Sequence, residues 1–268
     1  MTAAPLRAIA FDLFHTLVDP EEFRPPEFVR ATEIARLIGA PVEAFTAAWE
    51  RQNGERQVTM VPTVLDRARG LASEFGLAPD PRVWTSVNEV LTRYSDRALL
   101  HPRPGILRVL RQLRENGWTL GVISNCDESE MRAWSRSELA PIFTTARFSC
   151  EVGHAKPARE AFEALVPSWG GIPLGEAAFV GDGNNNELRG ARDAGFARVI
   201  FQFQFVSVNR LRSAEANDRL RKDADTTISH LGELLELFPR PSVSGESSGS
   251  TPGSWRPARS DGRGANGR

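Results

Sequence analysis

Three short apolar runs in this chain each end at a polar or acidic residue. Residues 6–11 end at Asp12, residues 120–123 end at Ser124, and residues 178–180 end just before Gly181 and Asp182. Apolar runs of this length, bounded in this way, predict buried β-strands. Between residues 104 and 201 they alternate with segments of helical periodicity, at 105–116, 128–139, 158–166 and 184–194. The alternation predicts an α/β fold, with a doubly wound, Rossmann-like parallel sheet covered by helices on both faces.

A block with a different hydrophobic pattern follows the first strand. Segments 27–38, 42–52, 64–75 and 83–99 repeat apolar residues at spacings of three and four, and breakers such as Asn53-Gly54 separate them. This pattern predicts helices without intervening strands. Because the first strand precedes the block, we expect an all-helical cap of residues 20–99 inserted into an α/β core of residues 1–19 and 100–239.

The last residues and the overall charge limit the possible partners. Residues 240–268 are rich in Ser, Gly, Pro and Arg, a composition that predicts a disordered tail. The net charge of −1, from 33 basic and 34 acidic residues, gives no basis for binding nucleic acid or a membrane surface. No apolar run reaches the roughly 18–20 residues that span a bilayer. Two cysteines are too few for a disulfide framework, so we expect a cytoplasmic protein. The oligomeric state stays open at this point.

The expected sheet brings reactive side chains to one place. Ligands of open parallel sheets bind beyond the carboxyl ends of the strands. Asp12, the pair Ser124-Asn125, and Asp182 with the nearby Glu187 all follow predicted strands, and Lys156 lies between the second and third of these groups. We therefore expect carboxylates, a hydroxyl, an amide and an ammonium group to line one pocket.

These motifs, in this order and with a helical insertion after the first, resemble the haloacid dehalogenase-like hydrolase superfamily over residues 6–238. The resemblance implies that Asp12 is a nucleophile that forms a covalent intermediate, and that Ser124 binds the group being transferred. It implies that Lys156 stabilises the nucleophile and the charged intermediate. It also implies a Mg²⁺ ion held by Asp182 and Glu187, together with Asp12 and the main-chain carbonyl of the residue at position 14.

The chemistry of these residue types agrees with those roles. A carboxylate attacks an anionic substrate well only when it is aligned and relieved of electrostatic repulsion, which Lys156 and Mg²⁺ would supply. The main-chain N–H groups of Leu13 and Phe14 are candidates to bind the developing charge on the substrate. Thr16 is expected either to orient the nucleophile or to form a turn, and Asn125 either to contact the transferred group or to form a turn.

One position departs from the phosphatases of the superfamily. They carry a second aspartate two residues after the nucleophile, which protonates the leaving group, and this chain has Phe14 there. General acid–base catalysis contributes about 10²–10⁴ in rate. Three explanations are open: a leaving group that needs no proton, such as halide or an acyl phosphate; a substitute acid, with His15 as the candidate in the motif; or loss of catalysis.

An aromatic residue at this position also occurs in haloacid dehalogenases, which need no metal. These dehalogenases also use an arginine of the cap. In this chain Arg51 does not stand at the matching sequence distance from Trp49, so it is not its counterpart. The acidic pair Asp182 and Glu187, placed beside a third carboxylate, would repel without a cation. We therefore predict a Mg²⁺-dependent, phosphatase-type hydrolase acting on a small phosphorylated metabolite. The alternatives are a dehalogenase or a catalytically impaired binding module.

Overall fold

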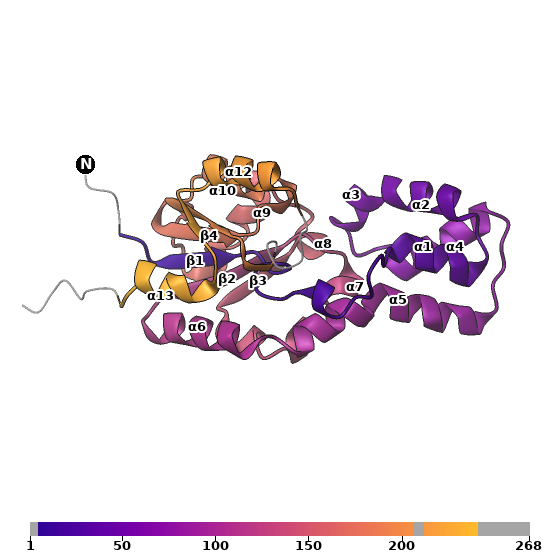
Figure 1. The fold of residues 1–268 in the computed structure, drawn as a ribbon, viewed down its shortest axis with the longest axis horizontal. Helices are drawn as coiled ribbons and strands as arrows, with labels where there is room; N and C mark the ends of the chain where they lie inside the picture. Colours follow the sequence, from indigo (N-terminus) through magenta and orange to yellow (C-terminus); the bar gives the residue numbers. More distant parts are fainter. Residues whose placement is uncertain (1–4, 206–211, 241–268) are drawn as a thin grey trace, which may run out of the picture.

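The computed structural model describes residues 5–205 and 212–240, and its centre is a parallel six-stranded sheet (Figure 1). The strand order is β3-β2-β1-β4-β5-β6, so β2 and β3 lie on one side of β1, and β4, β5 and β6 lie on the other. This confirms the predicted doubly wound α/β fold. The strands are β1 (Ala8–Phe11), β2 (Thr119–Ser124), β3 (Thr145–Phe148), β4 (Ala177–Gly181), β5 (Arg198–Gln202) and β6 (Thr226–Ile228).

Both faces of the sheet are buried, as the continuous apolar runs require. In β1 the side chains of Ile9 and Phe11 enter one apolar cluster, and those of Ala8 and Ala10 enter the other. Helices α6 (Pro104–Glu115) and α13 (Leu234–Leu237) cover the first face, and α9 (Arg159–Glu163) and α10 (Glu187–Ala194) cover the second (Figure 1). Helix α12 (Ala214–Asp223) packs beside α10 and β5.

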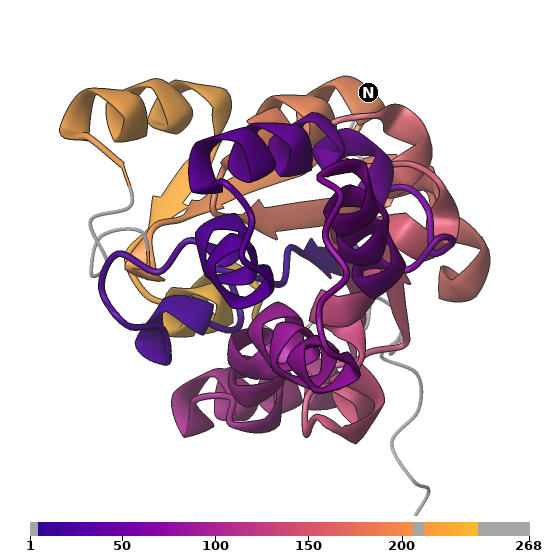
Figure 2. The same ribbon diagram turned by 90° about the vertical axis from the view of Figure 1, so that its right-hand side faces the viewer.

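A helical unit is inserted between β1 and β2, and Figure 2 shows it in front of the sheet. Its elements pack around a separate apolar cluster that includes Ile34, Phe45 and Trp49. Among the described residues 20–100 there is no strand. The boundaries at residues 19/20 and 99/100 stay predictions. The elements of this unit are η1 (Pro20–Glu22), α1 (Arg30–Ile38), α2 (Val42–Arg51), α3 (Asn53–Arg56), α4 (Val64–Glu74) and α5 (Pro81–Leu100).

Two local expectations were wrong. Residues 53–54, expected to break the helical pattern, begin the single turn of α3. Residues 128–139, expected to form one helix, form α7 (Glu128–Met131) and the 3₁₀ turn η2 (Trp134–Arg136). Packing explains the second difference: Trp134 lies against the ring of Phe148, and the Ser137 hydroxyl donates to the carbonyl of Leu99. These contacts draw the chain onto the core and away from a straight helical path.

The remaining short elements connect the larger ones. They are η3 (Ala140–Ile142), α8 (Ser149–Val152), η4 (Val166–Trp169), η5 (Leu174–Glu176), η6 (Asn184–Asn186) and η7 (Leu231–Glu233). The tail predicted to be disordered, residues 240–268, lies outside the described residues except for Arg240. Within residues 5–205 and 212–240, every helix is too short or too polar to cross a bilayer.

Candidate active site

The carboxyl edge of the sheet holds a cavity of about 220 Å³ beneath the inserted helices. Asp12 follows β1 directly, Ser124 ends β2, and Asp182 follows β4. All three line this cavity, and so do Lys156 and Glu187. The structure therefore brings together residues that lie far apart in the sequence, as the expected parallel sheet required.

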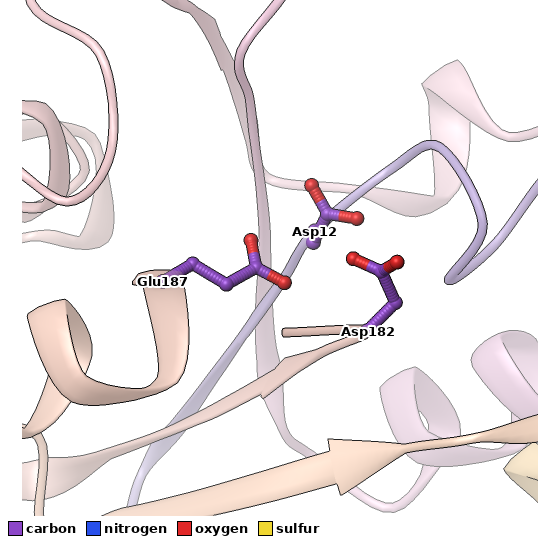
Figure 3. Close-up of side chains that lie close together, drawn as sticks. All are labelled: Asp12, Asp182 and Glu187. Atoms are coloured by element: carbon purple, nitrogen blue, oxygen red, sulfur yellow. The ribbon is translucent and has the colours of Figure 1, made fainter. Parts of the chain in front are cut away.

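Three carboxylates face one another in this cavity, as Figure 3 shows for Asp12, Asp182 and Glu187. One oxygen from each lies within 4.8 Å of the others, and all three residues are buried. The first turn of α10 carries Glu187, whose Oε1 accepts a hydrogen bond of 2.9 Å from the N–H of Gly183. A Cβ atom at Gly181 would lie 2.3 Å from that same oxygen, so this position needs a glycine.

Lys156 joins two of the carboxylates. Its Nζ donates to Oδ1 of Asp12 at 2.5 Å, to Oε2 of Glu187 at 2.6 Å and to the carbonyl of Ile123 at 3.1 Å. The lysine is only 4% exposed, and three acceptors use its three protons. Asn125 fixes the main chain beside it, because its amide accepts from the Lys156 N–H and donates to the Lys156 carbonyl, both at 2.7 Å.

Burial and mutual repulsion set the charges of the cluster. Burial raises the pKa of the Asp12 carboxyl, although the Lys156 ammonium opposes the increase. The pKa of Glu187 lies well above its usual value because the residue is buried and because Asp12 is close. Burial also opposes the charged form of Lys156, but the two carboxylates outweigh it and raise the pKa of the ammonium group. The site thus favours a proton or a cation among its carboxylates.

A second cation of the site was missed by the sequence reasoning. Arg212 donates from Nη2 to Oδ2 of Asp182 at 2.8 Å, and its Nη1 contacts the Asp182 carbonyl. The guanidinium group is half-buried beside the cavity. No periodic pattern or motif marks Arg212, since it precedes α12 in a connecting segment, and only the folded chain brings it to Asp182.

The residues fit a magnesium ion on the chemistry of their donors. Carboxylate oxygens are ligands that Mg²⁺ prefers, and Asp12, Asp182 and Glu187 supply three buried carboxylates within reach of one another. Burial raises the pKa of Asp12 and of Glu187, and the neighbouring carboxylates raise both further, so a bound cation would offset part of this cost. In the part of the chain that the structure describes, the main-chain carbonyl of Phe14 accepts no hydrogen bond and so is available as a further oxygen ligand.

The other predicted residues of the first loop lie at different depths. Phe14 and His15 line the cavity, whereas the Leu13 side chain is fully buried in the apolar core. Thr16 is buried, and its hydroxyl partly offsets the increase in the pKa of Asp12. His15 adopts a left-handed backbone conformation with φ of 62°, and its Nδ1 lies 3.6 Å from Oδ1 of Asp19.

The inserted helical unit forms part of the wall of the cavity. Pro20, Arg24, Gln57 and Ser95 come from η1, the loops and α5, and they line the same cavity as Asp12. None of these four residues was predicted from the sequence. Their spacing in the chain is irregular, and their approach to the sheet depends on how the helices pack.

With this geometry in place, comparison with known proteins identifies the class. The family model of the haloacid dehalogenase-like hydrolases matches residues 6–195, most of the chain. The chain belongs to this family of hydrolases, which confirms the resemblance drawn from its motifs.

Particular relatives are similar over most of their length. A glyceraldehyde 3-phosphate phosphatase of Methanothermobacter thermautotrophicus is 30% identical over 87% of this chain and 100% of its own length. One of Pyrococcus abyssi is 28% identical over 74% of this chain and 82% of its own length. Among solved structures, a 2-haloacid dehalogenase of Pseudomonas syringae superposes with a TM-score of 0.61 and 23% identity over 87% of this chain and 97% of that one. A haloacid dehalogenase-like phosphatase of Thermococcus onnurineus superposes with a TM-score of 0.58 and 20% identity over 88% and 99%.

Proposed function

We propose that this protein is a Mg²⁺-dependent phosphatase that hydrolyses a small phosphorylated metabolite through an aspartyl phosphate. The observation that carries the proposal is the buried cluster of Asp12, Asp182 and Glu187 around Lys156. Three buried carboxylates fit a divalent cation and, with it, an anionic substrate. The glyceraldehyde 3-phosphate phosphatases to which the chain is similar support the same reaction class.

Asp12 is the nucleophile of this proposal. Because Lys156 holds Oδ1, we assign the attack on phosphorus to Oδ2. The new bond joins Oδ2 to phosphorus while the bond from phosphorus to the leaving oxygen breaks, and water then hydrolyses the aspartyl phosphate. Ser124 and the main-chain N–H groups of Leu13 and Phe14 bind the phosphoryl oxygens, where donors stabilise developing charge.

Lys156 and its neighbours position the nucleophile. The ammonium group is held by acceptors on three sides, so it fixes the rotamer of Asp12 and offsets the negative charge of the intermediate. Asn125 acts through the main chain of Lys156, which it holds at both the N–H and the carbonyl. Thr16, buried beside Asp12, supports the orientation of the carboxylate.

The metal ligands in this proposal are Asp12, the carbonyl of Phe14, Asp182 and Glu187. A bound Mg²⁺ would neutralise charge on the phosphoryl group and lower the repulsion met by the attacking carboxylate. We also infer a cytoplasmic location, because Cys126 and Cys150 are buried free thiols.

With Phe14 at this position, the protein lacks the acid that protonates the leaving group in phosphatases of the family. We propose that turnover therefore favours substrates whose leaving group departs as a stable anion, such as aryl and acyl phosphates. His15 is the alternative donor. A His15→Asn variant that loses activity only with alkyl phosphates would assign the proton transfer to His15, and unchanged rates would assign the preference to the leaving group alone.

A substrate panel tests the function directly. Alkyl, aryl and acyl phosphates and 2-haloacids are each assayed with Mg²⁺ and with a chelator, using Asp12→Asn as the control for contaminating phosphatases. Phosphate release that the chelator abolishes supports the proposal. Halide release that the chelator does not affect would establish the dehalogenase instead, and no turnover of any compound would indicate a binding module.

A further inference from the structure

A second cavity opens beside the active site and is lined by the inserted helical unit. Its volume is about 230 Å³, and it shares Arg24, Gln57 and Glu130 with the cavity that holds Asp12. The two cavities are therefore neighbours, and the proposal below places one substrate across both. The part of this second cavity formed by Arg24, Asn53, Arg56 and Gln57 is called the cap subsite below.

Arg56 is the unusual residue of the cap subsite. It is 4% exposed, yet it forms no ion pair with any residue that the structure describes. Its Nη1 donates to the carbonyl of Trp49 at 2.5 Å, its Nη2 donates to Oδ1 of Asn53 at 3.0 Å, and its guanidinium lies 4.4 Å from the centre of a Trp49 ring. These contacts fix the group without neutralising it, and burial lowers its pKa.

Donors without acceptors point to what the cap subsite binds. The buried Nε atoms of Arg56 and Arg24 have no hydrogen-bond partner among the described residues. An unpaired buried donor destabilises the folded protein, and more strongly when the group is charged. Both arginines line the second cavity, where a bound anion could accept from their guanidinium groups.

The acidic residues of the same cavity do not supply that acceptor. Arg30 donates to Oδ2 of Asp127 at 2.7 Å and to Oε1 of Glu130 at 2.5 Å. The other oxygens of this pair accept main-chain N–H groups at the start of α7. Glu50 lies at the exposed rim. Arg24 already pairs with Glu21, whereas Asp127, Glu50 and Glu130 attract Arg56 without forming an ion pair with it, so Arg56 is the guanidinium of the subsite that can pair directly with a bound anion.

We propose that the cap subsite binds a carboxylate of the substrate, so that the enzyme acts on small phosphorylated carboxylic acids. This inference rests on the proposed phosphatase function and specifies its substrate class. A carboxylate carries one negative charge, which matches one unpaired guanidinium, and its two oxygens can accept from Arg56 and Arg24 together. The chain should therefore prefer 3-phosphoglycerate to glyceraldehyde 3-phosphate, the compound named in its relatives, whose end remote from the phosphate is an uncharged aldehyde.

The test compares kcat/KM for 3-phosphoglycerate and glycerol 3-phosphate, which differ at the end remote from the phosphate. We expect a ratio of at least ten in the unaltered protein, and we expect Arg56→Gln to lower that ratio at least tenfold through a higher KM for the acid. Arg56→Lys keeps the charge but not the planar fork of the guanidinium group. Its ratio should therefore lie between that of the unaltered protein and that of Arg56→Gln. Arg69→Gln is the matched control, because Arg69 also lies over a tryptophan ring, that of Trp84, but lines neither cavity.

Each result decides a separate point. Equal kcat/KM values for the two substrates, or a ratio unchanged by Arg56→Gln, would overturn the cap subsite and leave the phosphatase standing. If Arg56→Gln does not fold, the cap subsite is judged from the ratio in the unaltered protein and from the decrease of that ratio in Arg24→Gln. Both compounds are alkyl phosphates, so if neither is hydrolysed, the aryl and acyl phosphates of the substrate panel decide whether the protein is a phosphatase. Calorimetry then decides the subsite, which stands if 3-phosphoglycerate binds at least tenfold more tightly than glycerol 3-phosphate and falls if it does not.

Discussion

Replacing Lys156 by methionine removes the cation that joins two buried carboxylates of the candidate site. Methionine has a similar length, so the change deletes the charge and its three hydrogen bonds while leaving most of the packing. Asp12 and Glu187 stay buried, at 6% and 1% exposure, with no ammonium between them. We expect the metal-free variant to be markedly less stable than the unaltered protein.

The size of the loss follows from the burial of the contacts. Removing one partner of a buried ion pair costs about 3–5 kcal/mol, because the remaining charge is left uncompensated. Lys156 serves two carboxylates through bonds of 2.5 and 2.6 Å, which favours the upper part of this range. For a chain of this size, 1 kcal/mol corresponds to about 2–4 °C in Tm. The expected decrease in Tm is therefore about 10–20 °C.

The assay is urea unfolding of the metal-free protein, followed by tryptophan fluorescence and circular dichroism. Lys222→Met is the matched control, because the chain has two lysines and Lys222 is exposed on α12. We expect the control to change the free energy of unfolding by less than about 0.5 kcal/mol. Mg²⁺ should recover part of the loss in the Lys156 variant, since a ligand that binds the folded state stabilises it. A loss below about 1 kcal/mol would refute the electrostatic account of this site.

Three further predictions concern the same site. Asp12→Asn should abolish phosphate release while the circular dichroism spectrum stays unchanged, and turnover at the unaltered rate would contradict the aspartyl intermediate. Phe14→Asp should raise kcat for alkyl phosphates by about 10² or more, the contribution of a general acid; no gain would show that the pocket is shaped for other chemistry. Arg212→Met should tighten Mg²⁺ binding severalfold in calorimetry, because the arginine competes for Asp182, and weaker binding would instead make Arg212 a positioning residue for that carboxylate.

The sheet, and the edge at which the candidate site residues gather, could be predicted because each depends on a local signal. Short apolar strands ending at Asp12, Ser124 and Asp182 define both the parallel sheet and the edge at which their side chains meet. The contact between Lys156 and Asp12 spans 144 residues of sequence, and it was expected from the family resemblance because Lys156 follows no strand directly.

The contacts of arginine with the site could not be predicted in the same way. Arg212 and Arg56 occur in a chain with many arginines and lie outside any motif. The position of Arg56 depends on the single turn of α3, which the pair Asn53-Gly54 argues against at the level of propensity. The face of Trp49 and the Asn53 side chain hold the guanidinium in place, and such packing has no periodic pattern.

The central place of β1 in the sheet has a consequence for synthesis of the chain. Its neighbours begin at Thr119 and Ala177, so one edge of this apolar strand lacks a partner until nearly half of the chain has been made, and the other edge until about two thirds has been made. At about 5–20 residues per second the second neighbour follows after roughly 10–30 s. The helices of the insertion emerge during this wait and can form their own apolar cluster. An unpaired strand edge invites pairing with other chains, so the yield of folded protein should depend on temperature and on chaperones during translation.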